Sequence, residues 1–264
     1  ALRVEDTENP ERFKVSGRGE LHLSILIETM RREGYELAIS RPEVILHETD
    51  DGLEEPYEQL VVDLESAYQG AIMERLGERR GELRNMQLDG KGRVRLDYLI
   101  PARGLIGFQS EFRTLTAGTG LMFHVFDHYG PWVPGDISRR SNGVLISNGT
   151  GKALAYALFN LQERGRMIID PGVEVYEGQI VGIHSRANDL TVNPLKGKQL
   201  TNIRTVLKDE ALLLTSPVKM SLEQALEFIE DDELVEVTPK AIRIRKIHLQ
   251  EQERKRAGRQ KAEA

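Results

Sequence analysis

Residues 184–204 form a long polar stretch in which cationic side chains outnumber the single acidic one. Cations can bind phosphate oxygens, and amide side chains can hydrogen-bond to base edges, so the stretch suits nucleic acid. It contains neither the apolar alternation of a strand nor the apolar stripe of a helix, which predicts a long mobile loop. The residues that we expect to contact RNA are Arg186, Asn188, Lys196, Lys198, Asn202 and Arg204.

The alternative for this stretch is an ordinary solvated connection between strands, because surface loops are polar in most proteins. A net charge of -6 also argues against a general affinity for nucleic acid. The charge is uneven, however, with acidic residues crowded in 227–236 and basic residues in 242–261. Cations at turns or on the polar face of an expected strand are secondary candidates for RNA contacts: Lys91, Arg93, Lys152, Arg243 and Arg245.

Other kinds of site find little support. The glycine turn at 149–152 is similar to the end of a phosphate-binding loop, but Ile146 and Ala153 stand where that motif needs a glycine and a hydroxyl, so we reject a nucleotide site. His124 and His128 fall on an expected strand and not on one helical face, and we expect no metal site. Neither a nucleophile with its base nor a pair of catalytic carboxylates stands out, so this chain is not expected to be an enzyme.

The chain has 264 residues and no cysteine. Disulfides and thiolate metal sites are therefore excluded, and the reducing cytoplasm is the expected compartment. No apolar run is long enough to span a bilayer and no signal peptide opens the chain, so we expect no membrane association. The first residue is Ala1 rather than methionine, which suggests a piece cut from a longer protein.

The elements that would position these side chains define an α+β protein. Two short strands, a helix over 20–33 and a strand over 35–39 give the order ββαβ, which is half of a ferredoxin-like unit. Apolar alternation at Leu60, Val62 and Leu64 then begins a complete βαββαβ unit, and a β-rich region with short helices follows. The expected division is a truncated unit over 1–42, a ferredoxin-like domain over 43–129, a β-rich domain over 130–250 and a charged, frayed or disordered tail over 251–264.

Several long motifs resemble those of one protein family. Residues 16–23 resemble the signature of domain III in translational GTPases similar to elongation factor G. The motifs that resemble domain V of those proteins lie at 55–57, 77–81, 100–107, 115–120 and 127–129. The motifs that resemble the C-terminal domain peculiar to the BipA (TypA) branch lie at 142–147, 175–178, 188–193, 200–202 and 232–239. The resemblance covers essentially the whole chain.

This resemblance implies a function at the ribosome. Members of the family are ribosome-associated GTPases that act in stress-dependent translation and in assembly of the 50S subunit. The domain that binds GTP and magnesium would precede Ala1, so no cofactor is expected in this chain. The implied partners of a monomeric protein are the 50S subunit and the 70S ribosome, with contacts to 23S rRNA and to the tRNA acceptor end near the A site. By the same resemblance, RNA contacts are carried over to Arg186, Asn188, Lys196, Lys198 and Arg204.

Two other kinds of function stay open at this point. Ferredoxin-like domains of the ACT type bind a small metabolite, which would require a ligand pocket at a dimer interface and no salt-sensitive RNA binding. A structural protein that binds charged protein partners is the third possibility. Deletion of residues 188–202 would then leave its binding intact.

Overall fold

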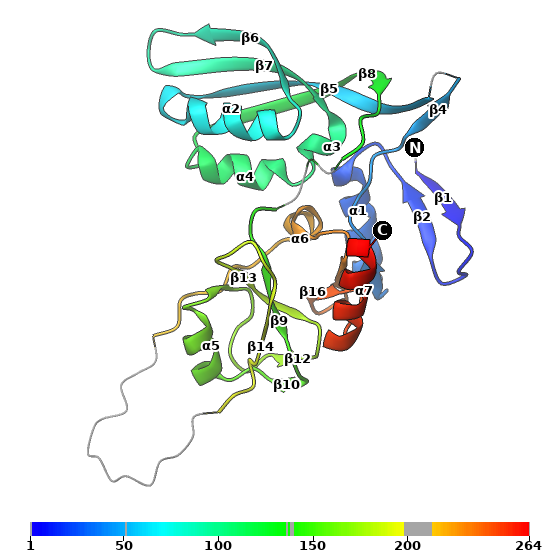
Figure 1. Ribbon diagram of the computed structural model, residues 1–264, viewed down its shortest axis with the longest axis vertical. Helices are drawn as coiled ribbons and strands as arrows, with labels where there is room; N and C mark the ends of the chain where they lie inside the picture. Colours follow the sequence, from blue (N-terminus) through cyan, green and yellow to red (C-terminus); the bar gives the residue numbers. More distant parts are fainter. Residues whose placement is uncertain (1, 51, 136, 138–139, 198–212, 264) are drawn as a thin grey trace. The chain divides into compact units, whose positions relative to one another are not determined.

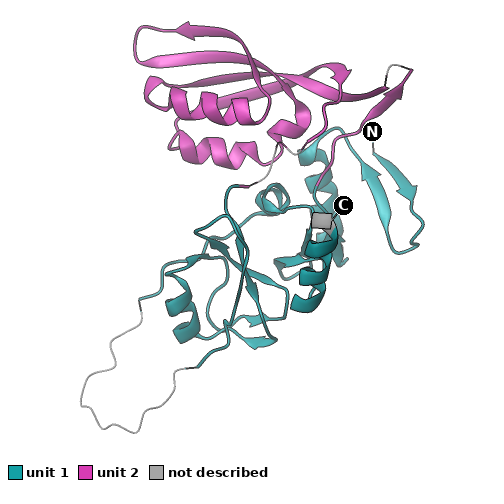
Figure 2. Ribbon diagram, viewed as in Figure 1, with its two compact units in different colours: residues 1–41, 141–264 teal, residues 42–140 magenta. Residues whose placement is uncertain are grey.

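The computed structural model describes residues 2–50, 52–135, 137, 140–197 and 213–263. Its short helices stand among several separate sheets, which confirms the α+β class. The chain divides into two compact units, residues 42–140 and residues 1–41 together with 141–264 (Figure 2). Among the described residues, no helix is long and apolar enough to cross a membrane.

The unit of residues 42–140 is built on one antiparallel sheet, and its strand order β6-β7-β5-β8 is that of a ferredoxin-like fold. The strands are β4 (His47–Thr49), β5 (Gly52–Glu65), β6 (Glu82–Leu88), β7 (Arg93–Pro101) and β8 (Leu121–Pro131). The helical segments are η1 (Ser66–Tyr68), α2 (Gln69–Glu78), α3 (Ala102–Leu105) and α4 (Phe108–Leu115). Figure 1 shows α2 and α4 on the same face of this sheet, so the expected βαββαβ unit is confirmed.

Alternation along the two central strands of this sheet explains why the helices cover one face. On β5, Leu60, Val62 and Leu64 are fully buried, while the residues between them are partly exposed. The side chains that meet them from β7, α2 and α4 form a single hydrophobic core. They are Val94, Leu96, Tyr98, Ile100, Ile72, Leu76, Phe108 and Phe112.

Two arginines hold the segment that follows β8. Arg103 donates from Nη2 to the carbonyl of Val133 and from Nη1 to that of Gly135, at 2.5 Å each. Arg80 donates from its two Nη atoms to the carbonyls of Val133 and Pro134, at 2.7 Å each. Because these bonds keep the segment with the ferredoxin-like unit, the boundary expected at residue 129 falls after residue 140.

In the unit of residues 1–41 and 141–264, the described residues form four smaller sheets, with strand orders β1-β2, β10-β12, β11-β13-β9-β14 and β16-β15-β3. Its first strands are β1 (Arg3–Asp6), β2 (Phe13–Ser16) and β3 (Leu37–Ile39). The later strands are β9 (Val144–Ser147), β10 (Gly151–Lys152), β11 (Gly165–Met167), β12 (Glu174–Val175), β13 (Ile180–His184), β14 (Leu190–Val192), β15 (Glu233–Val237) and β16 (Ile242–Lys246). The helices are α1 (Glu20–Arg32), α5 (Ala155–Leu161), α6 (Leu222–Phe228) and α7 (Glu251–Glu263).

Residues 1–41 keep the expected order ββαβ, but their strands do not form one sheet. Among the described residues β1 and β2 pair with each other, whereas β3 joins β15, with Ile39 opposite Val235. Ile27 of α1 enters the same hydrophobic core as Val235. A half unit has too few strands to enclose a core of its own. Ile27, Leu37 and Ile39 pack against the later part of the chain, whereas Val4 and Phe13 stay exposed. The domain expected over 1–42 is thus part of one compact unit with 141–264.

Strand β9 is the central strand of this unit because both of its faces are buried. Val144 and Ile146 belong to the core that includes Ile27 and α6, whereas Leu145 belongs to a second core with α5. Strands β13 and β14 flank β9, antiparallel and parallel respectively. The ends of these two strands therefore set the position of the loops that carry the expected RNA contacts.

The structure corrects two sequence-based expectations in this unit. Residues 184–204 are not one continuous loop, because β13 ends at His184 and β14 occupies Leu190–Val192. The spacing of Leu154, Leu158 and Leu161 predicts a helix over 152–164, but the observed helix is shorter, since Lys152 lies in β10 and α5 begins at Ala155. In the tail of residues 251–264, where the sequence predicts a frayed helix or disorder, helix α7 is present, and Arg254 Nη1 donates to the carbonyl of His248 at 3.2 Å.

Candidate nucleic-acid interface

The turn of residues 185–189, between β13 and β14, is held by its own backbone and by the start of β9. The amide of Gly143 donates to the carbonyl of Arg186 at 2.8 Å, and the amide of His184 donates to the carbonyl of Gly143 at 2.9 Å. The imidazole Nδ1 of the buried His184 lies 2.5 Å from the carbonyl oxygen of Asn188. The side chains of Arg186 and Asn188 remain exposed, so this turn presents a cation and an amide on a fixed backbone.

Close backbone approach makes Gly143 necessary in this arrangement. A Cβ atom built on Gly143 would lie 2.2 Å from the carbonyl oxygen of Asn188, which is shorter than any real contact of that kind. The carbonyl belongs to the backbone of the turn and cannot move without moving Asn188 itself. The glycine in the motif at 142–147 therefore allows the start of β9 to touch the turn.

Two further arginines lie beside this turn, and the sequence reasoning did not select them. The amide of Ser185 donates to the carbonyl of Arg164 at 2.9 Å, and β11 pairs with β13 from Gly165 opposite His184. Arg164 and Arg166 are exposed on either side of Gly165. We call Arg164, Arg166 and Arg186 the arginine end of the sheet, where β11 begins and β13 ends. Only the pairing of β11 with β13 brings these three positions together, and no sequence motif indicates it.

The electrostatic setting of the arginine end differs from that of most other arginines. Within the part of the chain that the structure describes, none of its three guanidinium groups pairs with a carboxylate. Elsewhere, ion pairs with neighbouring carboxylates occupy Arg75, Arg79, Arg93, Arg95, Arg103 and Arg245. Exposed guanidinium groups without a carboxylate partner are suited to bind phosphate oxygens.

The structure separates Lys196 from Arg186. Strand β14 runs between them, and the amide of Leu154 donates to the carbonyl of Pro194 at 2.9 Å, at the opposite end of the sheet. This bond joins the segment of Lys196 to that of Lys152, so these two predicted residues lie in neighbouring segments. Both lysines are exposed. Lys198, Asn202 and Arg204 lie outside the described residues.

The secondary candidates divide into paired and unpaired cations. Arg93 Nε donates to Asp63 Oδ1 at 2.7 Å, and Arg245 Nε lies 2.8 Å from Glu236 Oε1, so both cations are neutralised within their own sheets. Lys91 is exposed in the β6–β7 hairpin, whose turn is held by Asp89 Oδ1 accepting from the amides of Lys91 and Arg93. These two backbone hydrogen bonds lower the pKa of Asp89. Arg243 makes no ion pair with the described residues.

A buried lysine stands behind the turn of residues 185–189. Lys246 Nζ lies 2.6 Å from Asp189 Oδ2, and 2.9 Å from carboxylate oxygens of both Asp232 and Glu233. Burial lowers the pKa of Lys246, but the charges of Glu233, Asp232 and Asp189 outweigh burial and raise that pKa to about 12. Lys246 is therefore a permanent cation at neutral pH.

The glycine turn at 149–152 does not have the structure of a phosphate-binding loop. Lys152 lies in strand β10 opposite Glu174, and α5 does not begin until Ala155. A P-loop lysine stands at the N-terminus of a helix, where backbone amides cradle the phosphates. Among the described residues, no group of three or more histidine, aspartate or glutamate side chains is arranged to hold a metal ion.

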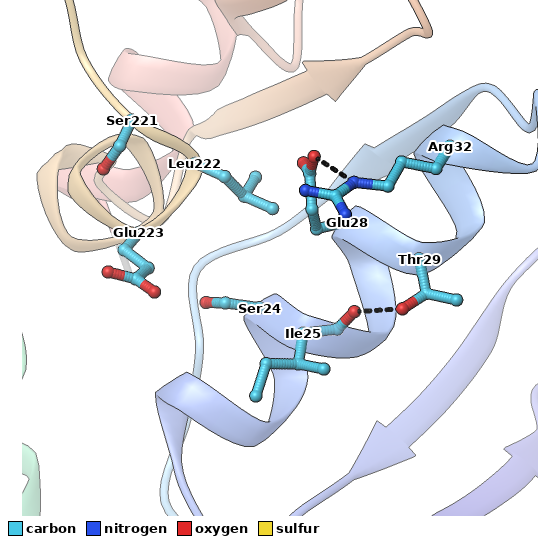
Figure 3. A pocket seen from close by; sticks show the side chains of 8 residues that line it. All are labelled: Ser24, Ile25, Glu28, Thr29, Arg32, Ser221, Leu222 and Glu223. Carbon is cyan, nitrogen blue, oxygen red and sulfur yellow. Dashed lines mark hydrogen bonds and ion pairs between the residues drawn. The ribbon is translucent and has the colours of Figure 1, made fainter.

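Two cavities in the described residues lie away from the predicted contacts. Figure 3 shows α1 and α6 facing each other across a groove of about 410 Å³, lined by Ile25 and Leu222 among others. Its cation Arg32 is already bonded to Glu28, at 3.1 Å between Nε and Oε1. A second cavity of about 570 Å³ lies on the open face of the sheet of residues 42–140, where Arg95 pairs with Asp97.

Comparison with known proteins connects these observations with a family. Residues 52–140 match the family described as elongation factor G C-terminus, and residues 142–251 match the family described as TypA/BipA C-terminal domain. The chain is 66% identical over 259 residues to the large ribosomal subunit assembly factor BipA of Haemophilus influenzae, covering 98% of this chain and 42% of that protein. It is 65% identical to the protein of the same name from Salmonella typhimurium, with 98% and 43% covered.

The two matched regions are carboxyl-terminal domains, one of the elongation factor G type and one of the TypA/BipA type. The chain belongs to the BipA (TypA) family and carries the C-terminal domain that distinguishes that family. It spans less than half the length of the curated relatives that it matches. These matches do not favour the small-metabolite regulatory module considered above.

Proposed function

We propose that this chain is the ribosome-binding C-terminal region of a BipA-type GTPase that acts in stress-dependent translation and in assembly of the 50S subunit. The relatives with 66% and 65% identity are both named as assembly factors of the large ribosomal subunit, which supports this proposal. In this proposal, GTP and magnesium bind to a domain outside this chain. The protein acts in the cytoplasm as a monomer.

The observation that carries the RNA-binding part of this proposal is the arginine end of the sheet. Three exposed guanidinium groups without carboxylate partners among the described residues stand at the ends of two paired strands, in a protein whose net charge is -6. An acidic protein that binds RNA must concentrate its cations on one surface, because its overall charge repels phosphate. The partners are the 50S subunit and the 70S ribosome, and the ligand is 23S rRNA together with the tRNA acceptor end near the A site.

A second contact surface consists of Lys152 and Lys196 at the opposite end of the same sheet. Both side chains are exposed, and the hydrogen bond between Leu154 and Pro194 holds their segments together. Lys198, Asn202 and Arg204 follow Lys196 in the sequence and lie outside the described residues, and they remain proposed RNA contacts. Lys91 and Arg243 each stand alone and contribute less to RNA binding. Arg93 and Arg245 are excluded as RNA contacts, because each forms an ion pair with a carboxylate of its own sheet.

The test is cosedimentation of the chain with 50S subunits and 70S ribosomes over a series of salt concentrations. A variant with Arg164, Arg166 and Arg186 changed to alanine is expected to show a flatter salt dependence, by about 0.7 to 0.9 in log–log slope for each lost phosphate contact. The matched control changes Arg3, Arg32 and Arg95 to alanine. It removes the same positive charge from the chain, but these arginines pair with Glu5, Glu28 and Asp97. Its slope is expected to equal that of the unmodified chain.

Each other outcome has a definite meaning. Failure of the unmodified chain to bind either particle at low salt contradicts the proposed function for this region. Binding with equal slopes for both triple variants contradicts the role of the arginine end. The same salt series with Lys152 and Lys196 changed to alanine then decides whether the opposite end of the sheet carries the contacts.

A further inference from the structure

Lys246 of β16 contacts two other segments of the chain, the turn after β13 and the start of β15. Its ammonium group meets Asp189 in the turn after β13, Asp232 in the turn before β15, and Glu233 at the first position of β15. The side chain of Lys246 is 3% exposed and that of Glu233 is 0% exposed, whereas Asp189 and Asp232 are 37% and 64% exposed. The ammonium group is therefore fastened to the interior by Glu233 and reaches toward the surface through the other two carboxylates.

Asp189 has a second anchor. Its Oδ1 accepts a hydrogen bond from the amide of Val144 at 2.9 Å, while its Oδ2 faces Lys246. One carboxylate thus ties the end of the turn both to β9 and to β16. Asn188 precedes Asp189 directly and Arg186 lies three residues before it, so the position of Asp189 constrains both exposed side chains.

We infer that Lys246 is a positioning residue for RNA binding: through Asp189 it holds the turn of residues 185–189 in the form that presents Arg186 and Asn188 to RNA. This inference rests on the proposed function. Lys246 is buried and does not touch the ligand. Its effect on affinity arises because a turn that is already ordered loses less conformational freedom on binding than a turn that must be ordered by the ligand.

The substitution Asp189→Asn separates positioning from simple electrostatics. Asparagine keeps an oxygen for the amide of Val144 but cannot form the ion pair with Lys246. Removal of a negative charge beside Arg186 strengthens attraction to RNA phosphates if charge alone matters. Loss of positioning acts in the opposite direction, and the sign of the change in affinity therefore distinguishes the two.

The matched control is Asp232→Asn. It removes one carboxylate from the same ammonium group, at 2.9 Å, but leaves the turn of residues 185–189 anchored. For Asp189→Asn, we expect binding to 50S subunits at moderate salt to weaken by about threefold to tenfold, the range that ordering one or two side chains at an interface produces. For Asp232→Asn, we expect unchanged binding.

Amide hydrogen exchange supplies a readout that does not depend on the ribosome. The amide of Gly143, which donates to the carbonyl of Arg186, is expected to exchange faster in Asp189→Asn and at the original rate in Asp232→Asn. Equal or tighter ribosome binding by Asp189→Asn would overturn the inference, and so would equal weakening by both variants. If the unmodified chain fails to bind, the proposed function fails, whereas unchanged exchange at Gly143 shows that the anchoring itself is wrong.

Discussion

The carboxylate of Glu55, which is 0% exposed, accepts hydrogen bonds from Nε and Nη2 of Arg103 at 2.5 and 3.1 Å. The same guanidinium group also donates to the carbonyls of Val133 and Gly135. Arg103 thus neutralises a buried charge at the start of β5 and fastens the segment that follows β8. Removal of one partner from a buried ion pair strongly destabilises the folded state, because the other charge stays buried and unpaired.

Arg103→Met is therefore expected to destabilise the chain by about 3 to 5 kcal/mol. Denaturant unfolding monitored by circular dichroism measures this change. Arg95→Met is the control, because Arg95 pairs with Asp97 on the sheet surface with its own side chain 53% exposed. The control is expected to cost less than about 1 kcal/mol. Equal losses for the two variants would show that the burial of Glu55 is not what makes its ion pair important.

Gly143→Ala is expected to destabilise the unit of residues 1–41 and 141–264 by more than about 2 kcal/mol, because the new Cβ would meet a backbone oxygen of Asn188 at 2.2 Å. Gly77→Ala is the contrasting variant. Gly77 lies inside α2 and a Cβ there meets no atom within 4 Å, so alanine should stabilise the helix by about 0.5 to 1 kcal/mol. Thermal unfolding of both variants tests the opposite signs, and stabilisation by Gly143→Ala would mean that the turn can withdraw from β9.

The stability of the chain is expected to fall in strongly alkaline solution through Lys246. Burial lowers the pKa of this lysine, but its three carboxylate neighbours outweigh burial and raise the pKa from 10.5 to about 12. A group whose pKa is higher in the folded state stabilises fully below its unfolded pKa, so this contribution is complete below pH 10.5 and is lost as the pH passes about 12. The loss of stability between these two pH values should be steeper in the unmodified chain than in Lys246→Met.

Tyr176 also lowers the stability of the chain in alkaline solution, so its effect must be separated from that of Lys246. Burial, followed by the hydrogen bond and charge of Glu236, raises the pKa of the Tyr176 hydroxyl. Its contribution also disappears as the solution becomes alkaline. The comparison is therefore made in a Tyr176→Phe background, with and without the further substitution Lys246→Met, where any remaining difference in pH dependence cannot come from the phenol. Identical alkaline profiles for these two variants would contradict the prediction.

Helix α6 begins with a capping box formed by Ser221 and Gln224. Ser221 Oγ accepts from the amide of Gln224 at 3.3 Å, and Gln224 Oε1 accepts from the amide of Ser221 at 2.9 Å. Ser221→Ala is expected to lower the free energy of unfolding by about 1 kcal/mol. The amide of Gln224 loses its acceptor, and the reciprocal hydrogen bond from the amide of Ser221 is weakened. Ser221→Asp should restore most of that loss, and an unchanged stability for the alanine variant would deny the cap any role.

The ferredoxin-like unit could be predicted from sequence because its signals are local. Alternation at Leu60, Val62 and Leu64 and the helical spacing of Ile72 and Leu76 each define an element without reference to the rest of the chain. The turn that begins at residue 89 has the same local character. The family could be recognised for a related reason, since its motifs are continuous runs of residues.

Strand β14 could not be predicted in the same way. It contains only Leu190, Thr191 and Val192, and it forms by parallel pairing with β9, whose residues lie far away in the sequence. The polar residues around it favour a loop by every local criterion. The pairing of β3 with β15 has the same origin, because Leu37 and Ile39 find their partners at the other end of the chain.

The sequence by itself determined the elements of residues 42–140, the cations available for RNA and the family to which the chain belongs. Tertiary structure alone decided which cations lie together. Arg164 and Arg166 lie beside Arg186, and the segment of Lys196 lies beside that of Lys152. Arg93 and Arg245 form ion pairs with carboxylates. The physical reason is that a hydrophobic period is a property of neighbouring residues, whereas the surroundings of a charge depend on strand pairings between residues distant in the chain.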